Sequence, residues 1–412
     1  MLIDLVDATR ATSGGKAAQL AALLRAGLAV PPGFVVPMSA YEQALAGVDV
    51  VGAARVGAHH ARRVVEQVVL APALVEEIAA ALDRIGPQPG DSYVAVRSSA
   101  STEDGIEATA AGQHDTFLGV RGADQVVEAV RRCWASLWSE RAVAYRRHGS
   151  DGSLAVPPAT AVLVQRLVEA DVAGVLFTGA ATRIEASWGL GESVVGGRVT
   201  PDAWVVTDGV IVDRAVGGKT SRTDLVGTNV QTRPVPASDW NRPCLPDQDV
   251  RELARVGRLI ERVHGGRLDV EWAIADGQVW ILQARPITAD LPEAAAAPTP
   301  ACPGRVNLTG TPASPGRATG PVRLIRGPSA FARLRTGDIL VCRTTDPAWT
   351  ALFGVAAAVV TETGGLLSHA AIVAREYGLP AVVAVTGATT VLRDGALVAV
   401  DGSTGRVVRT AD

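Results

Sequence analysis

One histidine of this sequence lies in a context that suits phosphoryl transfer. The segment from Thr361 to Glu376 reads TETGGLLSHAAIVARE, so that two glycines and a serine precede His369. The pattern predicts a strand, a glycine turn and a helix over 368–377 with His369 in its first turn. The positive end of a helix favours a neutral imidazole and stabilises an attached phosphate, and a neutral ring nitrogen is a nucleophile toward phosphorus. A lone histidine is more often a hydrogen-bonded structural residue, and only the surrounding sequence favours the catalytic interpretation.

Two basic residues of the N-terminal part stand where a phosphate could contact both a positive side chain and backbone N–H groups. Lys16 follows two glycines at the start of a predicted helix over 15–27, and glycine lets the backbone approach a phosphate closely. Arg97 ends a predicted buried strand over 93–97, and the small residues SSAS that follow leave room for phosphate oxygens. A plain helix start and an ordinary strand end with a flexible loop are the alternatives.

A pair of oxygen-bearing side chains predicts a magnesium site. Glu271 and Gln283 belong to two predicted strands, and Asp276-Gly277, a strong turn signal, stands between them. Carboxylate and amide oxygens on such a hairpin suit Mg²⁺ that bridges nucleotide phosphates. Arg285 lies two residues beyond Gln283, on the same face of its strand, where it can neutralise phosphate charge. Each of these residues alone would be a solvated polar side chain on a strand.

Composition limits the class of protein. The 412 residues predict two to three domains, and 48% apolar against 20% charged residues argues against disorder. The net charge of −3 lacks the basic excess of a nucleic-acid binder, and no stretch approaches the roughly 20 apolar residues of a membrane-spanning helix. The N-terminus lacks the pattern of a signal peptide. We therefore expect a cytoplasmic protein without nucleic-acid or membrane partners, whose four cysteines are reduced structural thiols.

The elements that must position these residues fall on two sides of a linker. Residues 289–302 read ADLPEAAAAPTPAC, which is typical of a semi-extended connection. They separate a predicted domain over 1–288, which mixes helices with short buried strands in two lobes, from one over 303–412. The second domain alternates strands and helices and predicts a small, swivel-like α/β module, so the fold class combines α/β and α+β.

Together these segments resemble the phosphoenolpyruvate synthase / pyruvate phosphate dikinase family. Residues 11–288 resemble its ATP-grasp nucleotide-binding domain, in segments such as GGKAAQLAALLRAGLAVPPGFVV, YVAVRSSASTEDG, EASWGLGESVVGGRVTPD and DVEWAIADGQVWILQARPIT. The segment TGGLLSHAAIVAREYGLPAVV resembles its swivelling phosphohistidine domain, and GTPASPGRATGPV, TTDPAW and VDGSTGRV support this. In the family that domain moves on linkers, which is where residues 289–302 belong.

The resemblance implies roles for eight residues and two ligands, ATP and Mg²⁺. It implies that His369 carries the phosphoryl group, and that Lys16, Arg97 and Arg285 hold the phosphates and supply most of the catalysis by positioning and charge neutralisation. Metal binding falls to Glu271 and Gln283, whereas Gln165 and Glu185 match positions near the adenine and ribose. It assigns no role to His114.

The resulting prediction is an ATP-dependent phosphotransferase of the dikinase type. His369 attacks the β-phosphoryl group, AMP and ultimately phosphate are released, and the phosphoryl group passes to a hydroxyl or enol oxygen of a small molecule. Only residues 291–305 separate the two modules, so no acceptor domain like that of the family, or of the similar rifampicin phosphotransferases, is apparent. The acceptor, which need not be pyruvate, is expected on a separate subunit or between the two domains.

Two alternatives stay open at this point. One is an ATP-dependent condensation or dehydration enzyme of a biosynthetic pathway, similar to prodigiosin-type ligases, that consumes a phosphorylated intermediate. The other is a degenerate nucleotide-binding subunit of a two-component synthase. The filled phosphate and metal positions argue against the second.

Overall fold

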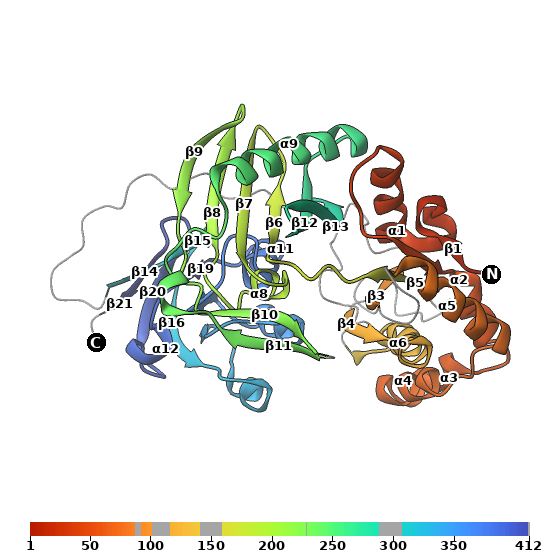
Figure 1. Cartoon of the computed structure of the whole chain (residues 1–412). Coiled ribbons are helices and arrows are strands. Elements are labelled where there is room, and N and C mark those ends of the chain that lie inside the picture. Colours follow the sequence, from red (N-terminus) through yellow and green to blue (C-terminus); the bar gives the residue numbers. More distant parts are fainter. Residues whose placement is uncertain (87–91, 101–115, 141–158, 228, 288–306, 411–412) are drawn as a thin grey trace. The chain divides into compact units, whose positions relative to one another are not determined.

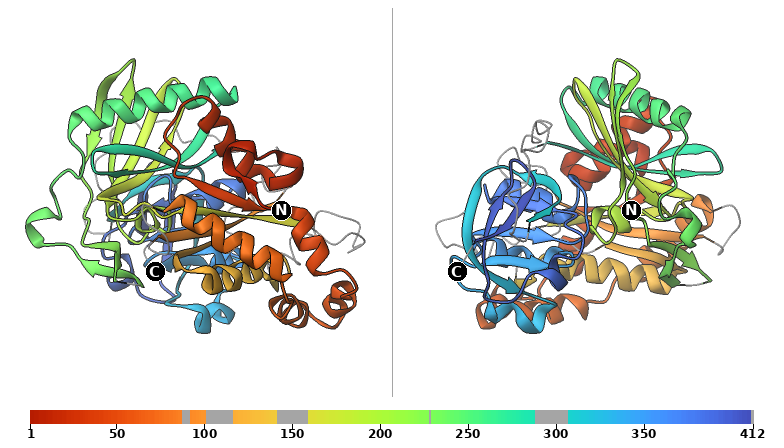
Figure 2. Two further views of the ribbon diagram at one scale, coloured as in Figure 1. Left: turned by 45° about the vertical axis from the view of Figure 1, so that its right-hand side comes forward. Right: turned by 90° about the vertical axis from the view of Figure 1, so that its left-hand side faces the viewer.

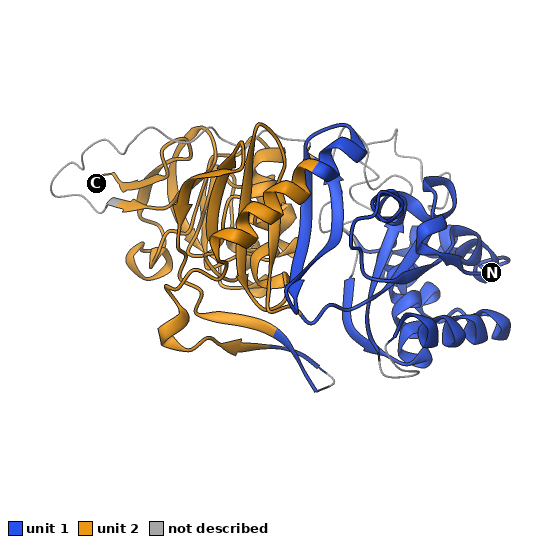
Figure 3. Cartoon of the chain, turned by 45° about the horizontal axis from the view of Figure 1, so that its top comes forward, with its two compact units in different colours: residues 1–169, 224–231, 259–286 blue, residues 170–223, 232–258, 287–412 orange. Residues whose placement is uncertain are grey.

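A computed structural model of the chain describes residues 1–86, 92–100, 116–140, 159–227, 229–287 and 307–410. Its contacts define two compact units, coloured separately in Figure 3. The first contains residues 1–169, 224–231 and 259–286, and the second contains residues 170–223, 232–258 and 287–412. The linker predicted over 289–302 lies outside the described residues, so the domain boundary there stays a prediction.

The first unit is built on a five-stranded antiparallel sheet in the order β1-β2-β5-β3-β4. Its strands are β1 (Ile3–Asp4), β2 (Gly33–Val36), β3 (Tyr93–Ala100), β4 (Thr116–Arg121) and β5 (Thr160–Arg166). Its helices, red to orange in Figure 1, are η1 (Leu5–Asp7), α1 (Arg10–Arg25), α2 (Met38–Ala44), α3 (Val50–Val56), α4 (Ala58–Glu66), α5 (Pro72–Ile85) and α6 (Ala123–Ser136). The helix predicted over 15–27 corresponds to α1.

The alternation of side chains gives this sheet two different faces. Phe34, Val96 and Val164 belong to a core that includes residues of α2 to α6. Because successive strand residues point to opposite faces, Arg97 and Gln165 lie on the other face of the sheet. The alternation of apolar and polar residues along the strands thereby places these polar residues on the face of the sheet opposite the core.

A hairpin completes the first unit. Strands β12 (Leu268–Ala275) and β13 (Gln278–Pro286) pair antiparallel across Asp276 and Gly277, whose φ angles are 51° and 71°. Two positive φ values characterise the tight turn that Asp-Gly favours. The predicted hairpin is therefore confirmed.

In the second unit, four strands pair antiparallel in sequence order: β6 (Val172–Phe177), β7 (Ala181–Trp188), β8 (Asp202–Thr207) and β9 (Val210–Ala215). Helix α8 (Glu192–Val195) and 3₁₀ helix η2 (Ala237–Asp239) also belong to it. Three further elements contribute residues to both units: β10 (Ser221–Val226), β11 (Asn229–Pro234) and α9 (Asp247–His264).

The rest of the second unit forms one module around an eight-stranded sheet in the order β14-β21-β20-β16-β17-β18-β19-β15 (Figure 2, cyan and blue). The strands are β14 (Asn307–Thr309), β15 (Thr311–Ser314), β16 (Arg317–Leu324), β17 (Ile339–Cys342), β18 (Ala358–Thr361), β19 (Ala381–Val383), β20 (Leu397–Asp401) and β21 (Arg406–Arg409). The helices are η3 (Pro328–Arg333), η4 (Pro347–Trp349), α10 (Thr350–Phe353), α11 (His369–Glu376) and α12 (Ala388–Val391). Strands β16 to β19 are parallel neighbours, as the predicted α/β module requires.

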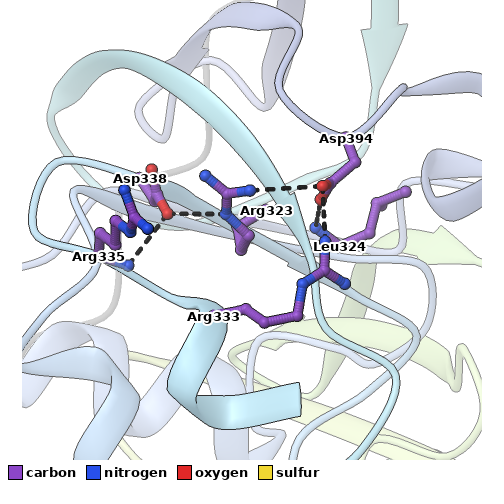
Figure 4. Close-up of polar contacts among 6 residues, drawn as sticks. All are labelled: Arg323, Leu324, Arg333, Arg335, Asp338 and Asp394. Atoms are coloured by element: carbon purple, nitrogen blue, oxygen red, sulfur yellow. Dashed lines mark hydrogen bonds and ion pairs between the residues drawn. The ribbon is translucent and has the colours of Figure 1, made fainter.

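An ion-pair cluster lies where the carboxyl end of β16 meets the amino end of β17 (Figure 4). Nε of Arg323 lies 2.9 Å from Oδ2 of Asp338, and its Nη1 lies 3.4 Å from Oδ2 of Asp394. Asp338 also accepts a hydrogen bond from the Arg335 N–H, and Asp394 pairs with Arg333. Asp338 directly precedes β17, so the cluster lies at the end of the sheet opposite the loops that follow β17 and β18.

A second ion pair is completely buried between Lys219 and Asp202. Nζ of Lys219 lies 2.5 Å from Oδ1 of Asp202 and donates to the carbonyls of Gly217 and Trp240 at 3.0 and 3.1 Å. Asp202 also accepts from the backbone N–H groups of Gly217 and Cys244. The pair therefore fastens the segment that follows β9 to the start of β8.

We expect Lys219→Met to lower the free energy of unfolding by about 3–5 kcal/mol, because it leaves the Asp202 carboxylate buried without its counter-charge. Urea denaturation followed by circular dichroism measures the loss. A double variant with Asp202→Asn as well should recover part of it. A single variant as stable as the wild type would contradict this account.

Candidate nucleotide and phosphohistidine sites

The start of α1 is shaped by its contact with β3. Gly14 interrupts the helix with φ 76° and ψ 176°, and a Cβ at this position would lie 2.1 Å from the carbonyl oxygen of Ser99. Immediately after it, the N–H of Ala17 donates to Oγ of Ser99 at 3.2 Å, and Nζ of Lys16 donates to the carbonyl of Ser98 at 3.1 Å. The glycine predicted to open the helix thus places Lys16 beside the strand that carries Arg97.

Arg97 joins β3 to the hairpin. The strand end predicted at Arg97 is wrong, because Ser98 to Ala100 continue the pairing with β5. Its Nη1 donates to the carbonyl of Leu282 on β13 at 3.0 Å, and its Nη2 lies 3.7 Å from Oε2 of Glu271 on β12. Both side chains are largely buried. The structure therefore brings Lys16, Arg97 and Glu271 into one neighbourhood within the first unit, as the sequence analysis expected.

The hairpin register aligns four polar residues on one face. Glu271 lies directly opposite Gln283, and Asp269 lies opposite Arg285. Nε of Arg285 lies 2.8 Å from Oδ2 of Asp269, and both residues are largely buried. Asp269 had no predicted role, although the two-residue spacing to Glu271 on a strand places it on the same face.

Two oxygen-bearing side chains fit a magnesium ion that arrives with phosphates. No group of three or more His, Cys, Asp or Glu residues that could hold a metal exists among the described residues. Mg²⁺ usually keeps several waters and binds through one or two carboxylates together with substrate phosphates. Glu271 and Gln283 match that pattern rather than a closed all-protein site.

Gln165 is buried, and its side chain is hydrogen-bonded within the first unit. It lies in β5 opposite Gly33, and its Nε2 donates to the carbonyl of Pro31 at 3.0 Å. A Cβ on Gly33 would lie 2.5 Å from the carbonyl oxygen of Val164, so glycine permits the close strand approach. The predicted contact of Gln165 with adenine stays a prediction.

His369 is the first residue of α11, in the second unit. Its Nδ1 lies 2.9 Å from Oγ1 of Thr345, and its ring meets Phe353 edge to face with 6.2 Å between centroids. The side chain is buried. Thr345 fixes the ring through Nδ1, which directs Nε2 away from that bond. Thr345 lies in the TTDPAW segment quoted for the resemblance, but the sequence did not identify it as a partner of His369.

Glu185 lies against the segment that leads to His369. Its Oε1 accepts a hydrogen bond from the N–H of Leu366 at 2.7 Å, and its Oε2 accepts one from Leu367 at 3.1 Å. Burial raises the pKa of Glu185 to about 7, although these two hydrogen bonds and the charges of Arg375 and Arg183 lower it. The residue predicted near the ribose is thus bonded to the loop before α11.

The remaining predictions concern thiols, membranes and the loop after β3. Cys133, Cys244 and Cys342 are buried thiols outside any disulfide, and burial raises the pKa of the Cys342 thiol, as expected of structural cysteines. Cys302 lies outside the described residues. None of the described helices is long and apolar enough to span a membrane. Residues 101–115, which include His114, lie outside the described residues.

Comparison with known proteins identifies the family. The model of the pyruvate phosphate dikinase AMP/ATP-binding domain matches residues 10–301, and that of the mobile domain of PEP-utilising enzymes matches residues 334–405. The chain belongs to this family. Its fold is accordingly an ATP-grasp-like domain followed by a PEP-utiliser domain.

Curated relatives match nearly the whole chain. The probable phosphoenolpyruvate synthase of Methanothermobacter thermautotrophicus is 39% identical over 96% of this chain and 61% of its own length. The phosphoenolpyruvate synthases of Aeropyrum pernix and Pyrococcus furiosus are 36% and 35% identical, each over 96% of this chain and 56% of their own length. The chain thus spans little more than half of these relatives. Among solved structures, aconitase X of Thermococcus kodakaraensis matches 26% of this chain and 98% of its own, with 20% identity and a TM-score of 0.22.

We expect Thr345→Val to change the tautomer balance of His369, because valine cannot bond to Nδ1. Where the Thr345 hydroxyl accepts from Nδ1–H, loss of this neutral hydrogen bond, about 1 kcal/mol, shifts the balance roughly fivefold toward the form protonated at Nε2. Nitrogen-15 NMR of labelled histidine measures it, and Thr345→Ser should restore the wild-type spectrum. An unchanged balance in the valine variant would show that Thr345 does not set the tautomer.

Proposed function

We propose that this protein is an ATP-dependent phosphotransferase of the dikinase type that carries its phosphoryl group on His369. The observation that carries the proposal is the Thr345 contact at Nδ1, on a buried histidine at the start of a helix. With Nδ1 protonated and held by Thr345, Nε2 keeps its lone pair for attack on phosphorus. Membership of a family named for its AMP/ATP-binding and mobile domains supports the same chemistry.

The residues of the first unit suit the polyphosphate of ATP. Lys16 near the start of α1, Arg97 on β3 and Arg285 on β13 supply positive charge and donors. Glu271 and Gln283 would hold Mg²⁺, which when bound bridges phosphate oxygens and reduces their charge. Catalysis then comes mainly from positioning and charge neutralisation.

The proposed cycle has three steps. Nε2 of His369 attacks the β-phosphorus of ATP and AMP leaves; water then removes the γ-phosphate from the pyrophosphorylated histidine. The remaining phosphoryl group passes to an oxygen of a small-molecule acceptor, and His369 returns to its neutral form. Because relatives are named phosphoenolpyruvate synthase, the enol oxygen of pyruvate is the first acceptor to test.

The site of the acceptor and the location of the protein are also part of the proposal. The acceptor would bind either on this protein or on a separate subunit. We place the protein in the cytoplasm, where thiols stay reduced, in agreement with the three described cysteines, which are buried and form no disulfide.

We expect β-labelled ATP with Mg²⁺ to leave acid-labile label on the chain, and γ-labelled ATP to leave none after the hydrolytic step. His369→Ala should abolish the label while nucleotide binding persists, and His60→Ala on α4, a matched control, should keep it. Filter binding and phosphoamino-acid analysis give the readout. Label that survives in His369→Ala would refute the relay, and label without a released phosphorylated product would favour a condensation enzyme.

We expect Glu271→Gln to raise the Mg²⁺ concentration required for half-maximal labelling about 10- to 100-fold, equivalent to losing a charged contact of about 1.5–3 kcal/mol. Nucleotide binding without Mg²⁺ should not weaken, because Arg97 loses a competing carboxylate. Isothermal titration with and without Mg²⁺ separates the two effects, with Glu261→Gln on α9 as control. An equal loss under both conditions would exclude a metal ligand.

A further inference from the structure

Residues 363–368, here called the His369 loop, are fixed to the segment 185–199 of the same compact unit. Oγ1 of Thr363 donates to the carbonyl of Gly197 at 2.6 Å, and the N–H of Gly364 donates to the carbonyl of Val199 at 3.1 Å. From the preceding loop, Oγ1 of Thr344 donates to the carbonyl of Gly196 at 2.8 Å. These bonds tie the loops after β17 and β18 to the turn that follows α8.

Apolar contact accompanies these hydrogen bonds. Leu367 is buried in a cluster with Val175, Phe177 and Val194, which belong to β6 and α8. This docked arrangement determines where α11, and therefore His369, is held. Any movement of the module that carries His369 has to break it.

Among the described residues of this contact, Glu185 is the one whose ionisable side chain accepts hydrogen bonds across it. It is 5% exposed and bonds to two successive backbone N–H groups, those of Leu366 and Leu367. A Cβ on Gly365 would lie 2.2 Å from its Oε2 and 2.5 Å from its Oε1. A side chain at Gly365, the second glycine of the GG pair, would therefore force the Glu185 carboxylate to move from this position.

We propose that Glu185 is a positioning residue that controls whether the His369 loop is docked or released. Its carboxylate accepts hydrogen bonds from the Leu366 and Leu367 N–H groups in the docked state only. The proposal rests on the phosphohistidine function proposed above, because release matters only if His369 has to reach two sites. Docking buries the carboxylate, and release returns it to water. The ionised carboxylate therefore loses its hydration on docking, and its two hydrogen bonds must offset that loss.

The balance of these effects makes docking dependent on pH. The charged groups that act on Glu185 are Arg183 on β7 and Arg375 on α11, and both favour its ionised form, yet burial outweighs them and raises the pKa of the docked residue from 4.5 to about 7. The docked state thus binds more protons between these two pH values. Docking is strongest at low pH, weakens as pH rises through this window, and does not change further through Glu185 above it.

Hydrogen exchange of the Leu366 and Leu367 amides tests the proposal on the full chain without nucleotide. A His369→Gln background removes the titration of the neighbouring imidazole. After correction for intrinsic rates, we expect protection to fall on the order of 100-fold between pH 5 and 8, since each pKa unit is a tenfold change. Glu185→Gln should make protection independent of pH and intermediate in size, because one acceptor oxygen remains. Wild-type-like pH dependence in this variant would overturn the proposal.

A double-mutant cycle tests the contact directly. Gly365→Ala should lose protection, because its Cβ meets the carboxylate, and Glu185→Ala should remove that clash so that the double variant is no less protected than Glu185→Ala alone. An equal loss from Gly365→Ala in both backgrounds would overturn the proposal. Asp338→Asn is the matched control: it also removes a buried carboxylate with two hydrogen bonds, but at the opposite end of the sheet.

The two proposals fail separately. Labelling of His369 with no effect of Glu185 on exchange would overturn the positioning role and leave the phosphotransferase intact. The expected exchange pattern without any label on His369 would overturn the phosphotransferase, and with it the reason for release.

Discussion

Burying charge is costly unless an opposite charge or a backbone dipole compensates it, and this constraint shapes both candidate sites. Arg97 lies near Glu271, Arg285 pairs with Asp269, and Glu185 is held by two backbone N–H groups. Each of these charged groups therefore has a partner inside the protein. A ligand that brings its own charges has to replace these partners with equivalent ones.

In the proposed function, magnesium and a polyphosphate would together satisfy that requirement in the first unit. The 3.7 Å separation between Arg97 and Glu271 is a loose ion pair, weaker than the 2.8 Å pair of Arg285 and Asp269. An anion added at Arg97 and a cation added at Glu271 preserve the local charge balance, whereas either one alone disturbs it. The Arg97–Glu271 contact therefore predicts that the two ions bind in a coupled way.

The sequence predicted what depends on local pattern, and it missed what depends on register and tertiary contact. The strand–glycine–helix order around His369 and the Asp276-Gly277 hairpin could be predicted because turn residues and apolar period determine them. Helix α9 has clear amphipathic spacing and could have been found. The Thr345 contact and the bonds of Glu185 to Leu366 and Leu367 join residues 24 and more than 180 positions apart, and no single-sequence pattern encodes them.

The two glycines before His369 show how one sequence feature can serve two physical demands. Gly364 adopts φ 111°, a backbone conformation that other residues rarely reach, so its role is to turn the chain after β18. Gly365 needs no such angle; its lack of a side chain leaves the space that the Glu185 carboxylate occupies. A substitution at Gly364 therefore strains the backbone whatever lies nearby, whereas the cost at Gly365 depends on whether the loop is docked. The first glycine sets the shape of the His369 loop, and the second lets that shape meet its partner.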